Sequence, residues 1–176
     1  ELVGIIGPNG AGQSTLVKTL FGLVRISSGL VTMRGEEITN LAAHELVARG
    51  VGYVPQRANV FETLTVEENL RMGLYLNPDV WDERLAVVHE LFPVLADRGD
   101  QRAGFMSGGE RQMLAMGRAL MMDPDVLLLD EPSAGLSPAN QDLVFERVRG
   151  ICDSGVSIVM VEQNARRCLQ ICDRAY

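Results

Sequence analysis

Four short apolar runs divide the chain and have the character of buried strands. They lie at residues 2–6 (LVGII), 51–54 (VGYV), 126–130 (VLLLD) and 156–161 (VSIVMV). None of them alternates apolar with polar residues, which favours strands covered on both faces, as in a parallel sheet. Apolar residues between the runs recur at helical spacing. The chain therefore alternates strands and helices, and we expect an α/β fold with a mostly parallel sheet.

Capping residues mark where several of the predicted helices begin. A Ser or Thr followed three residues later by Glu forms a capping box, and Ser, Asn or a following Pro is a simpler start signal. The candidates are Thr65 with Glu68, Ser107 with Glu110, Ser137 before Pro138, and Asn164. An amphipathic pattern predicts a further helix over 81–92. The segment 58–122 holds helical patterns and no strand-like run, so we expect a helical subdomain inserted into an α/β core.

Composition narrows the range of functions. The net charge of −7 argues against a protein that binds nucleic acid through its phosphates, because such binding needs a basic face. The three cysteines are odd in number and form no C-x-x-C, which argues against a disulfide or zinc framework. No apolar run approaches the roughly 18 residues of a membrane span. The chain opens directly in a strand-like run and stops at DRAY, the apparent start of another strand, so we expect the native protein to be longer at both ends.

One glycine-rich stretch, GPNGAGQST at residues 7–15, joins the first predicted strand to a helix. It matches the phosphate-binding pattern G-x-x-x-x-G-K-[ST], except that Gln13 stands at the lysine position. In such a turn, backbone N–H groups at the positive end of a helix surround a phosphate. The hydroxyl of Ser14 is placed to hold Mg²⁺. A plain strand-to-helix turn is the alternative for this stretch alone.

Two further stretches carry related chemistry. The run 126–130 ends in adjacent acids, of which Asp130 can hold magnesium and Glu131 can polarise an attacking water. A solvated acidic turn is the alternative here. The stretch MSGGERQ at 106–112 predicts a second helix N-terminus suited to an anion. One fold seldom needs two such sites for one nucleotide, whereas two copies facing each other would use both.

The order of these motifs resembles that of the ATP-binding cassette (ABC) ATPases. The motifs are the phosphate loop, YVPQ at 53–56, SGGERQ at 107–112, VLLLDEP at 126–132 and VEQN at 161–164. The resemblance covers essentially the whole chain, and it is strongest to ATPase subunits of bacterial branched-chain amino acid importers and related amide or urea importers. It implies a P-loop NTPase fold. Residues 1–57 and 123–176 would form a RecA-like nucleotide-binding core, and 58–122 the helical subdomain that ends in the signature helix.

The resemblance implies ATP and Mg²⁺ as cofactors and gives roles to matching residues. Nucleotide contacts are implied for Gly7, Pro8, Asn9, Gly10, Ala11, Gly12, Gln13, Ser14 and Thr15 and, toward the ATP of a partner subunit, for Ser107, Gly108, Gly109 and Glu110. Magnesium contacts are implied for Ser14, Gln56 and Asp130, and catalytic roles for Glu131, Gln56 and Gln163. Three positions depart from the superfamily pattern, and the aromatic residue that stacks on adenine in the family would lie upstream of the first strand, before the start of this sequence. Gln13 replaces the lysine, Gln163 the switch histidine, and Ser137 an aspartate in the loop 133–137.

The same resemblance implies partners and a cellular location. The chain would pair with a second cassette, either another copy or a paralogue, and would dock on transmembrane permease subunits. A periplasmic solute-binding protein would be an indirect partner, and no nucleic-acid partner is expected. The expected place is the cytoplasmic face of a bacterial inner membrane, as a peripheral subunit.

Gln13 changes the activity that we expect. Lysine brings a full charge to the phosphates, whereas glutamine offers a neutral NH₂ donor on a shorter arm. A hydrogen bond to a charged group contributes roughly 1.5–3 kcal/mol. We therefore expect weakened Mg-ATP binding and hydrolysis close to background. A nucleotide-binding but non-hydrolysing regulatory cassette is one alternative. A soluble cassette that works on nucleic acid is another, disfavoured by the acidic charge and by the short spacing between Gln56 and Ser107.

Overall fold

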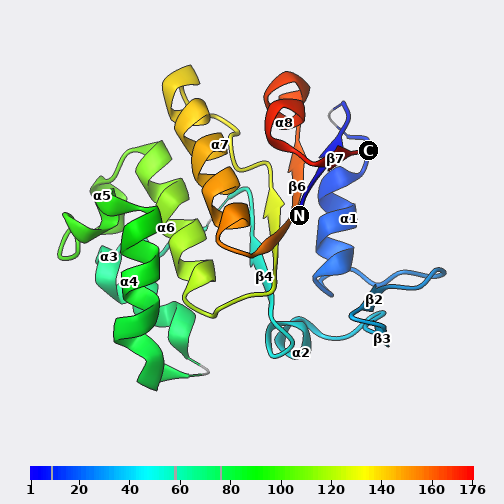
Figure 1. The fold of residues 1–176 in the computed structure, drawn as a ribbon, viewed down its shortest axis with the longest axis horizontal. Coiled ribbons are helices and arrows are strands. Elements are labelled where there is room, and N and C mark those ends of the chain that lie inside the picture. Colours follow the sequence, from blue (N-terminus) through cyan, green and yellow to red (C-terminus); the bar gives the residue numbers. More distant parts are fainter. Residues whose placement is uncertain (9, 58, 76) are drawn as a thin grey trace.

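A five-stranded parallel sheet forms the centre of the computed structural model, which describes residues 1–8, 10–57, 59–75 and 77–176 (Figure 1). The strands are β1 (Leu2–Ile6), β4 (Val51–Val54), β5 (Val126–Asp130), β6 (Ser157–Glu162) and β7 (Arg174–Ala175). Their order across the sheet is β4-β5-β6-β1-β7, and every neighbouring pair is parallel. The predicted α/β fold with a parallel sheet is confirmed. Three predicted strands match residue for residue, and the run 156–161 is shifted by one.

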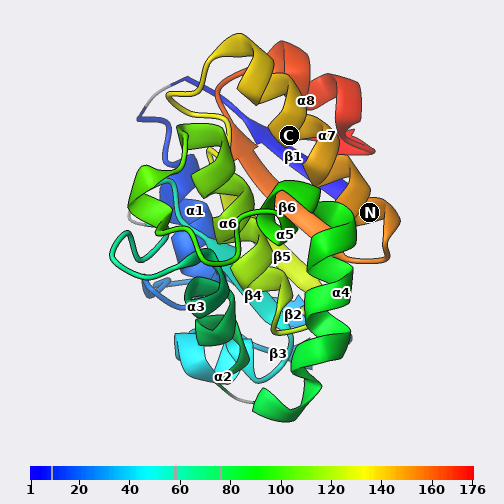
Figure 2. The same ribbon diagram turned by 90° about the vertical axis from the view of Figure 1, so that its left-hand side faces the viewer.

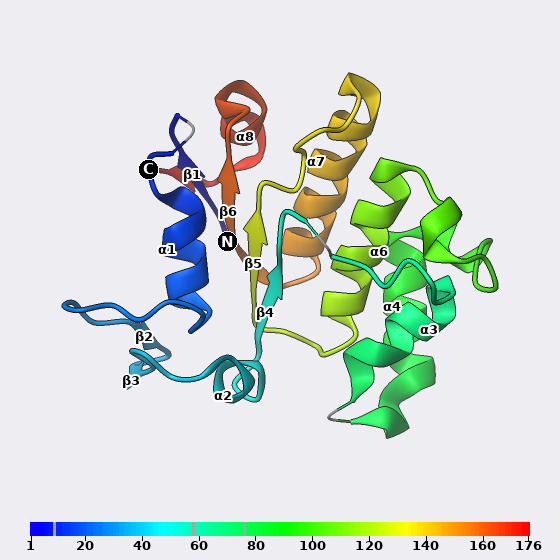
Figure 3. The ribbon, with the colours of Figure 1, turned by 180° about the vertical axis from the view of Figure 1, so that it is seen from behind.

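Helices cover the sheet on both faces (Figure 3). One face carries α1 (Gln13–Leu20), α2 (Ala43–Val47) and a small hairpin of β2 (Thr32–Met33) and β3 (Glu36–Glu37). The other face carries α6 (Gly108–Leu120), α7 (Pro138–Asp153) and α8 (Ala165–Ile171). In β5, Leu127 and Leu129 pack into the core on the α6 side, while Leu128 packs into the core on the α1 side. This two-sided burial explains why the strand runs do not alternate.

The segment between β4 and β5 is built from helices that gather around α6 (Figure 2). They are α3 (Val66–Arg71), η1 (Met72–Leu74), η2 (Pro78–Val80), α4 (Trp81–Leu91), α5 (Pro93–Ala96) and η3 (Ala103–Phe105). Within the described part of 58–122 there is no strand, only an isolated bridge between Thr65 and Arg102. The division of the chain into a core and a separate helical subdomain stays a prediction.

Most predicted helix starts lie where the capping residues indicate. Thr65 accepts from the backbone N–H of Glu68 at 3.1 Å, and Glu68 accepts from that of Thr65 at 2.8 Å, which confirms the capping box of α3. Asn164 accepts from the backbone of Arg167 at 3.3 Å and caps α8. Ser137 occupies the N-cap position of α7, but its side chain makes no capping hydrogen bond. There the helix start relies on Pro138 at the first helical position.

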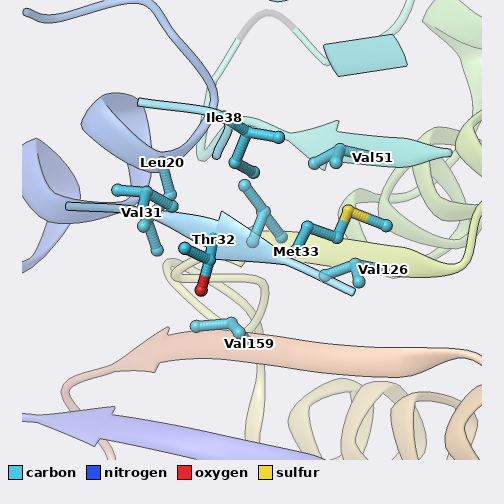
Figure 4. Close-up of a pocket in the computed structure, with 9 residues that line it drawn as sticks. Leu20, Val31, Thr32, Met33, Ile38, Val51, Val126 and Val159 are labelled. Carbon is cyan, nitrogen blue, oxygen red and sulfur yellow. The ribbon is translucent and has the colours of Figure 1, made fainter. Parts of the chain in front are cut away.

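An apolar cavity of about 180 Å³ lies between the β2–β3 hairpin and the sheet. Figure 4 shows side chains from α1, the hairpin and three strands around it, among them Leu20, Met33, Val51 and Val126. Val51 and Val126 are the first residues of their strands. The cavity therefore lies at the amino end of β4 and β5, opposite the edge where the motif residues follow the strands. Among the described residues, no helix is both long and apolar enough to cross a membrane.

The thiols of Cys168 in α8 and of Cys172, its C-cap residue, pack directly on β1. Cys168 and Cys172 are free thiols whose Sγ atoms lie 3.4 Å apart. A β-carbon at Gly4 would lie 2.6 Å from Cys168 Sγ and 2.7 Å from Cys172 Sγ. Gly4 is therefore required by the close approach of α8 to the sheet.

We expect Gly4→Ala to lower the free energy of unfolding by about 1–3 kcal/mol, because it overpacks this contact. Gly150→Ala is a matched control, since a β-carbon there meets only Leu91 at 3.8 Å. It should be neutral or stabilising by up to about 1 kcal/mol, the propensity gain of alanine in a helix. Urea unfolding of both variants tests the difference. Equal effects at the two positions would contradict this account of the packing.

Candidate functional site

The predicted site residues gather where the parallel strands end. The loop 7–15 follows β1, the pair Asp130 and Glu131 closes and follows β5, and Gln163 follows β6. Because β5, β6 and β1 are adjacent and parallel, their carboxyl ends lie at one edge of the sheet. Ligands of open α/β sheets bind at this edge.

The glycine-rich loop has the backbone that a close turn requires. Gly10 has φ 82° and Gly12 has φ 98°, both in the left-handed region. A β-carbon at either would meet nothing within 4 Å, so the conformation rather than space favours glycine. Gly12 is the N-cap of α1, with no side-chain cap and no acid in the first turn. The first N–H groups of α1 are therefore available to an anion. Asn9, which was also predicted to contact nucleotide, lies outside the described residues.

The side chain of Gln13 folds back over the phosphate loop. Its Nε2 atom would lie 2.6 Å from a β-carbon at Gly7, so it rests against the loop backbone. The same atom is buried and has no hydrogen-bond partner among the described residues. A buried donor without an acceptor is costly. This unpaired donor beside the loop fits a phosphate oxygen as its missing partner, although it carries no charge.

Ser14 and Tyr53 hold the two oxygens of a buried carboxylate. Ser14 Oγ donates to Asp130 Oδ1 at 2.7 Å, and the Tyr53 hydroxyl donates to Oδ2 at 3.3 Å. Asp130 is only 3% exposed. Burial, helped by the charge of Asp130, raises the pKa of Tyr53 to about 12. A hydroxyl beside a carboxylate is the hard-oxygen donor set that Mg²⁺ prefers, so the predicted pair of Ser14 and Asp130 fits this ion.

A second group of predicted residues converges on Glu131. Its Oε2 atom accepts from Gln56 Nε2 at 2.6 Å and from Gln163 Nε2 at 2.7 Å. The backbone of Glu131 has φ 48°, and its N–H donates to Val161 at 3.0 Å. The three residues predicted to be catalytic therefore meet at one carboxylate oxygen, Oε2 of Glu131. The contact of Gln56 is to Glu131, and its predicted role as a magnesium ligand stays a prediction.

Two residues near the site were missed by the sequence analysis. Tyr53 lies in YVPQ, where only Gln56 was given a role. Glu162 lies in VEQN, is buried, and accepts from the backbone N–H of Ser133 at 2.9 Å. Burial raises the pKa of Glu162 above its ordinary value. An acid at the last position of an apolar strand was the available signal for Glu162.

The predicted signature residues do not lie with the others. Ser107 is the N-cap of α6, which packs on the sheet face opposite α1 (Figure 1). Glu110 accepts from the backbone of Ser107 at 2.8 Å and pairs with Arg98 at 3.0 Å. A β-carbon at Gly109 would lie 2.9 Å from the Asn140 side chain, so packing on α7 already requires this glycine. The predicted contacts of Ser107, Gly108, Gly109 and Glu110 with a nucleotide stay predictions.

The residues at the carboxyl ends of the strands determine which ligands this edge of the sheet can bind and which chemistry it can support. The loop and the first turn of α1 can bind phosphate oxygens, and Glu131 can accept a proton from water. Ser14 and Asp130 would hold Mg²⁺, which supplies positive charge to neutralise phosphate oxygens when it is bound.

Comparisons with known proteins relate the whole chain to one family. The model of a family described as ABC transporter matches residues 1–134. The chain is similar to the high-affinity branched-chain amino acid transport ATP-binding protein BraG of Pseudomonas aeruginosa, with 48% identity over 177 residues that cover 100% of this chain and 76% of the relative. It is also similar to the probable branched-chain amino acid transport ATP-binding protein LivF of Archaeoglobus fulgidus, with 44% identity over 178 residues, 100% of this chain and 75% of that protein. A crystal structure of a nucleotide-free ATP-binding cassette from an ABC transporter superposes with a TM-score of 0.89 at 28% identity, covering 100% of this chain and 76% of that one.

Glu110 of the SGGERQ motif and Glu162 of the VEQN motif should make the stability of the protein depend on pH in opposite directions. Burial raises the pKa of Glu162, so its contribution to stability is full below pH 4.5 and is lost as the pH rises through its folded-state pKa. The backbone N–H of Ser107 lowers the pKa of Glu110, so that contribution is present above pH 4.5 and is lost as the pH falls. As the pH rises above 4.5, Glu162→Gln should therefore gain stability relative to wild type. As the pH rises towards 4.5 from below, Glu110→Gln should lose stability relative to wild type, so the range to be measured spans both sides of pH 4.5. Urea unfolding across this range measures both, and slopes of the same sign would contradict the assignment.

Proposed function

The chain belongs to the ABC transporter family of ATP-binding proteins, and on that premise we propose that it is an ATPase subunit that couples ATP binding and hydrolysis to solute import. The observation that carries the proposal is the convergence of Gln56 and Gln163 on Glu131, directly beside the Ser14–Asp130 pair. The names of the two relatives support a branched-chain amino acid as the solute.

The Glu131 carboxylate is the group suited to accept a proton from the attacking water. The two amide donors occupy Oε2 and fix the orientation of the side chain. Both donors are neutral amides, and Glu131 forms no ion pair among the described residues. Gln163 can therefore replace the switch histidine as an orienting donor.

The second nucleotide contact is proposed to come from another cassette. The phosphate loop and the N-terminus of α6 belong to helices on opposite faces of one sheet (Figure 3). One copy therefore does not present both to the same nucleotide. In a pair, Ser107 and Gly108 of each copy would contact the ATP bound to its partner.

Restoring lysine at position 13 should raise the rate of phosphate release by at least about tenfold. The charge that develops on the transferred phosphoryl group is what a lysine stabilises, and removing such an electrostatic contact typically costs 10²–10³-fold in rate. Glu131→Gln is the matched control and should abolish the gain in the lysine background.

The same assay distinguishes an ATPase impaired by Gln13 from a non-hydrolysing regulatory cassette. The neutral side chain of Gln13 favours a non-hydrolysing regulatory cassette. Such a cassette would bind Mg-ATP, while phosphate release would stay at background with either glutamine or lysine at position 13. If Gln13→Lys does not raise the rate of phosphate release, the hypothesis that Gln13 impairs hydrolysis is refuted. The regulatory cassette is then the hypothesis that remains.

A groove beside Gln56 is proposed as the contact for permease subunits. It has a volume of about 230 Å³ and runs between the end of β4 and the helices η1 and α6. Phe61 and Met72 line it and are about half exposed, and Arg118 reaches over the Phe61 ring. Exposed apolar side chains that line a groove mark an interaction site. Docking there would hold the chain at the cytoplasmic face of a membrane and link the permease to Gln56.

Met72→Glu should weaken copurification with co-expressed permease subunits encoded beside this chain. Losing the burial of one such side chain costs about 1.5–3 kcal/mol, or roughly 10- to 100-fold in affinity. Leu169→Glu, at an equally exposed apolar residue of α8 outside the groove, is the control and should copurify normally. Equal loss in both variants would argue against docking at the groove.

A further inference from the structure

Tyr53 contacts the site but has no role in the reaction described above. Its hydroxyl holds Asp130 Oδ2, while Ser14 holds Oδ1. From this geometry we propose that Tyr53 is a positioning residue for magnesium, which fixes the Asp130 carboxylate so that Oδ1 stays directed at Ser14. The inference rests on the proposed function, because it assumes that a magnesium nucleotide binds at this pair.

A carboxylate at this position needs two points of attachment. The terminal torsion of aspartate is broad, so a single hydrogen bond leaves rotation about the last bond poorly fixed. The Ser14 contact at 2.7 Å controls only one oxygen. The Tyr53 contact controls the other, and the two donors come from different elements, α1 and β4. Residues that orient a metal ligand in this way tune the metal affinity of the site.

The sheet and the phosphate loop helix hold Tyr53 in place. In the pairing of β4 with β5, Tyr53 lies opposite Leu128, two residues before Asp130. Its ring packs on Phe21, the C-cap residue of α1, with centroids 5.0 Å apart and an angle of 33° between the planes.

Tyr53 could instead serve only as a packing residue, because its ring also lines the groove beside Gln56. Tyr53→Phe separates the two roles, since it keeps the ring and removes only the hydroxyl. A packing role predicts no change that depends on magnesium. A positioning role predicts a loss confined to conditions in which magnesium is present.

The test measures the affinity of the full chain for a slowly hydrolysed ATP analogue by calorimetry, in Mg²⁺ and in EDTA. The ratio of the two affinities reports how strongly magnesium assists binding. In both the wild type and the Gln13→Lys protein, Tyr53→Phe should lower this ratio by roughly tenfold, as removal of a group that orients a metal ligand does. Affinity in EDTA should stay unchanged. Tyr75→Phe, at an exposed tyrosine outside the site, should leave the ratio as it is.

Each other outcome overturns a distinct statement. An unchanged ratio in Tyr53→Phe, or equal losses in Mg²⁺ and EDTA, overturns the positioning role and leaves the proposed function intact. If neither the wild type nor Gln13→Lys binds the analogue under either condition, the proposed function falls and the positioning role falls with it.

Discussion

The buried carboxylate of Asp130 is the constraint on which the geometry of the site depends. A charged group withdrawn from water is tolerated only when donors surround it. Asp130 finds its donors on the first turn of α1 and on β4, so one charge ties the helix after the phosphate loop to two strands. These hydrogen bonds thereby fix the start of α1, and with it the phosphate loop, relative to the carboxyl ends of β4 and β5.

The neighbouring acids are held in the same manner by neutral groups. Glu131 is bound by two side-chain amides and Glu162 by a backbone N–H. Among the contacts of the described residues, no lysine or arginine pairs with Asp130, Glu131 or Glu162. The edge of the sheet is therefore acidic, and Gln13 adds no charge to offset it. A triphosphate bound there would need the proposed magnesium ion and the helix dipole of α1 to balance its negative charge.

Local patterns predict much of this molecule because they reflect local physics. Apolar runs predict β1, β4 and β5 to the residue, and the Thr65–Glu68 pattern predicts the start of α3. Motif spacing also predicts which residues follow the strand ends. It does not predict Tyr53 or Glu162 as parts of the site, because their partners depend on β5 lying between β4 and β6 and on the register of these pairs. The folding of Gln13 onto Gly7 is likewise a tertiary contact with no local signature.

The backbone of Glu131 shows a conflict between stability and use. A residue with a β-carbon pays about 1–2 kcal/mol for the left-handed conformation that this position adopts, whereas glycine tolerates it and asparagine suffers less. Directed evolution for heat resistance alone would therefore drift towards Gly or Asn at 131. The variants selected in this way would be more stable and would lack the carboxylate. The catalytic role proposed for this carboxylate would account for a glutamate at a position whose backbone favours glycine.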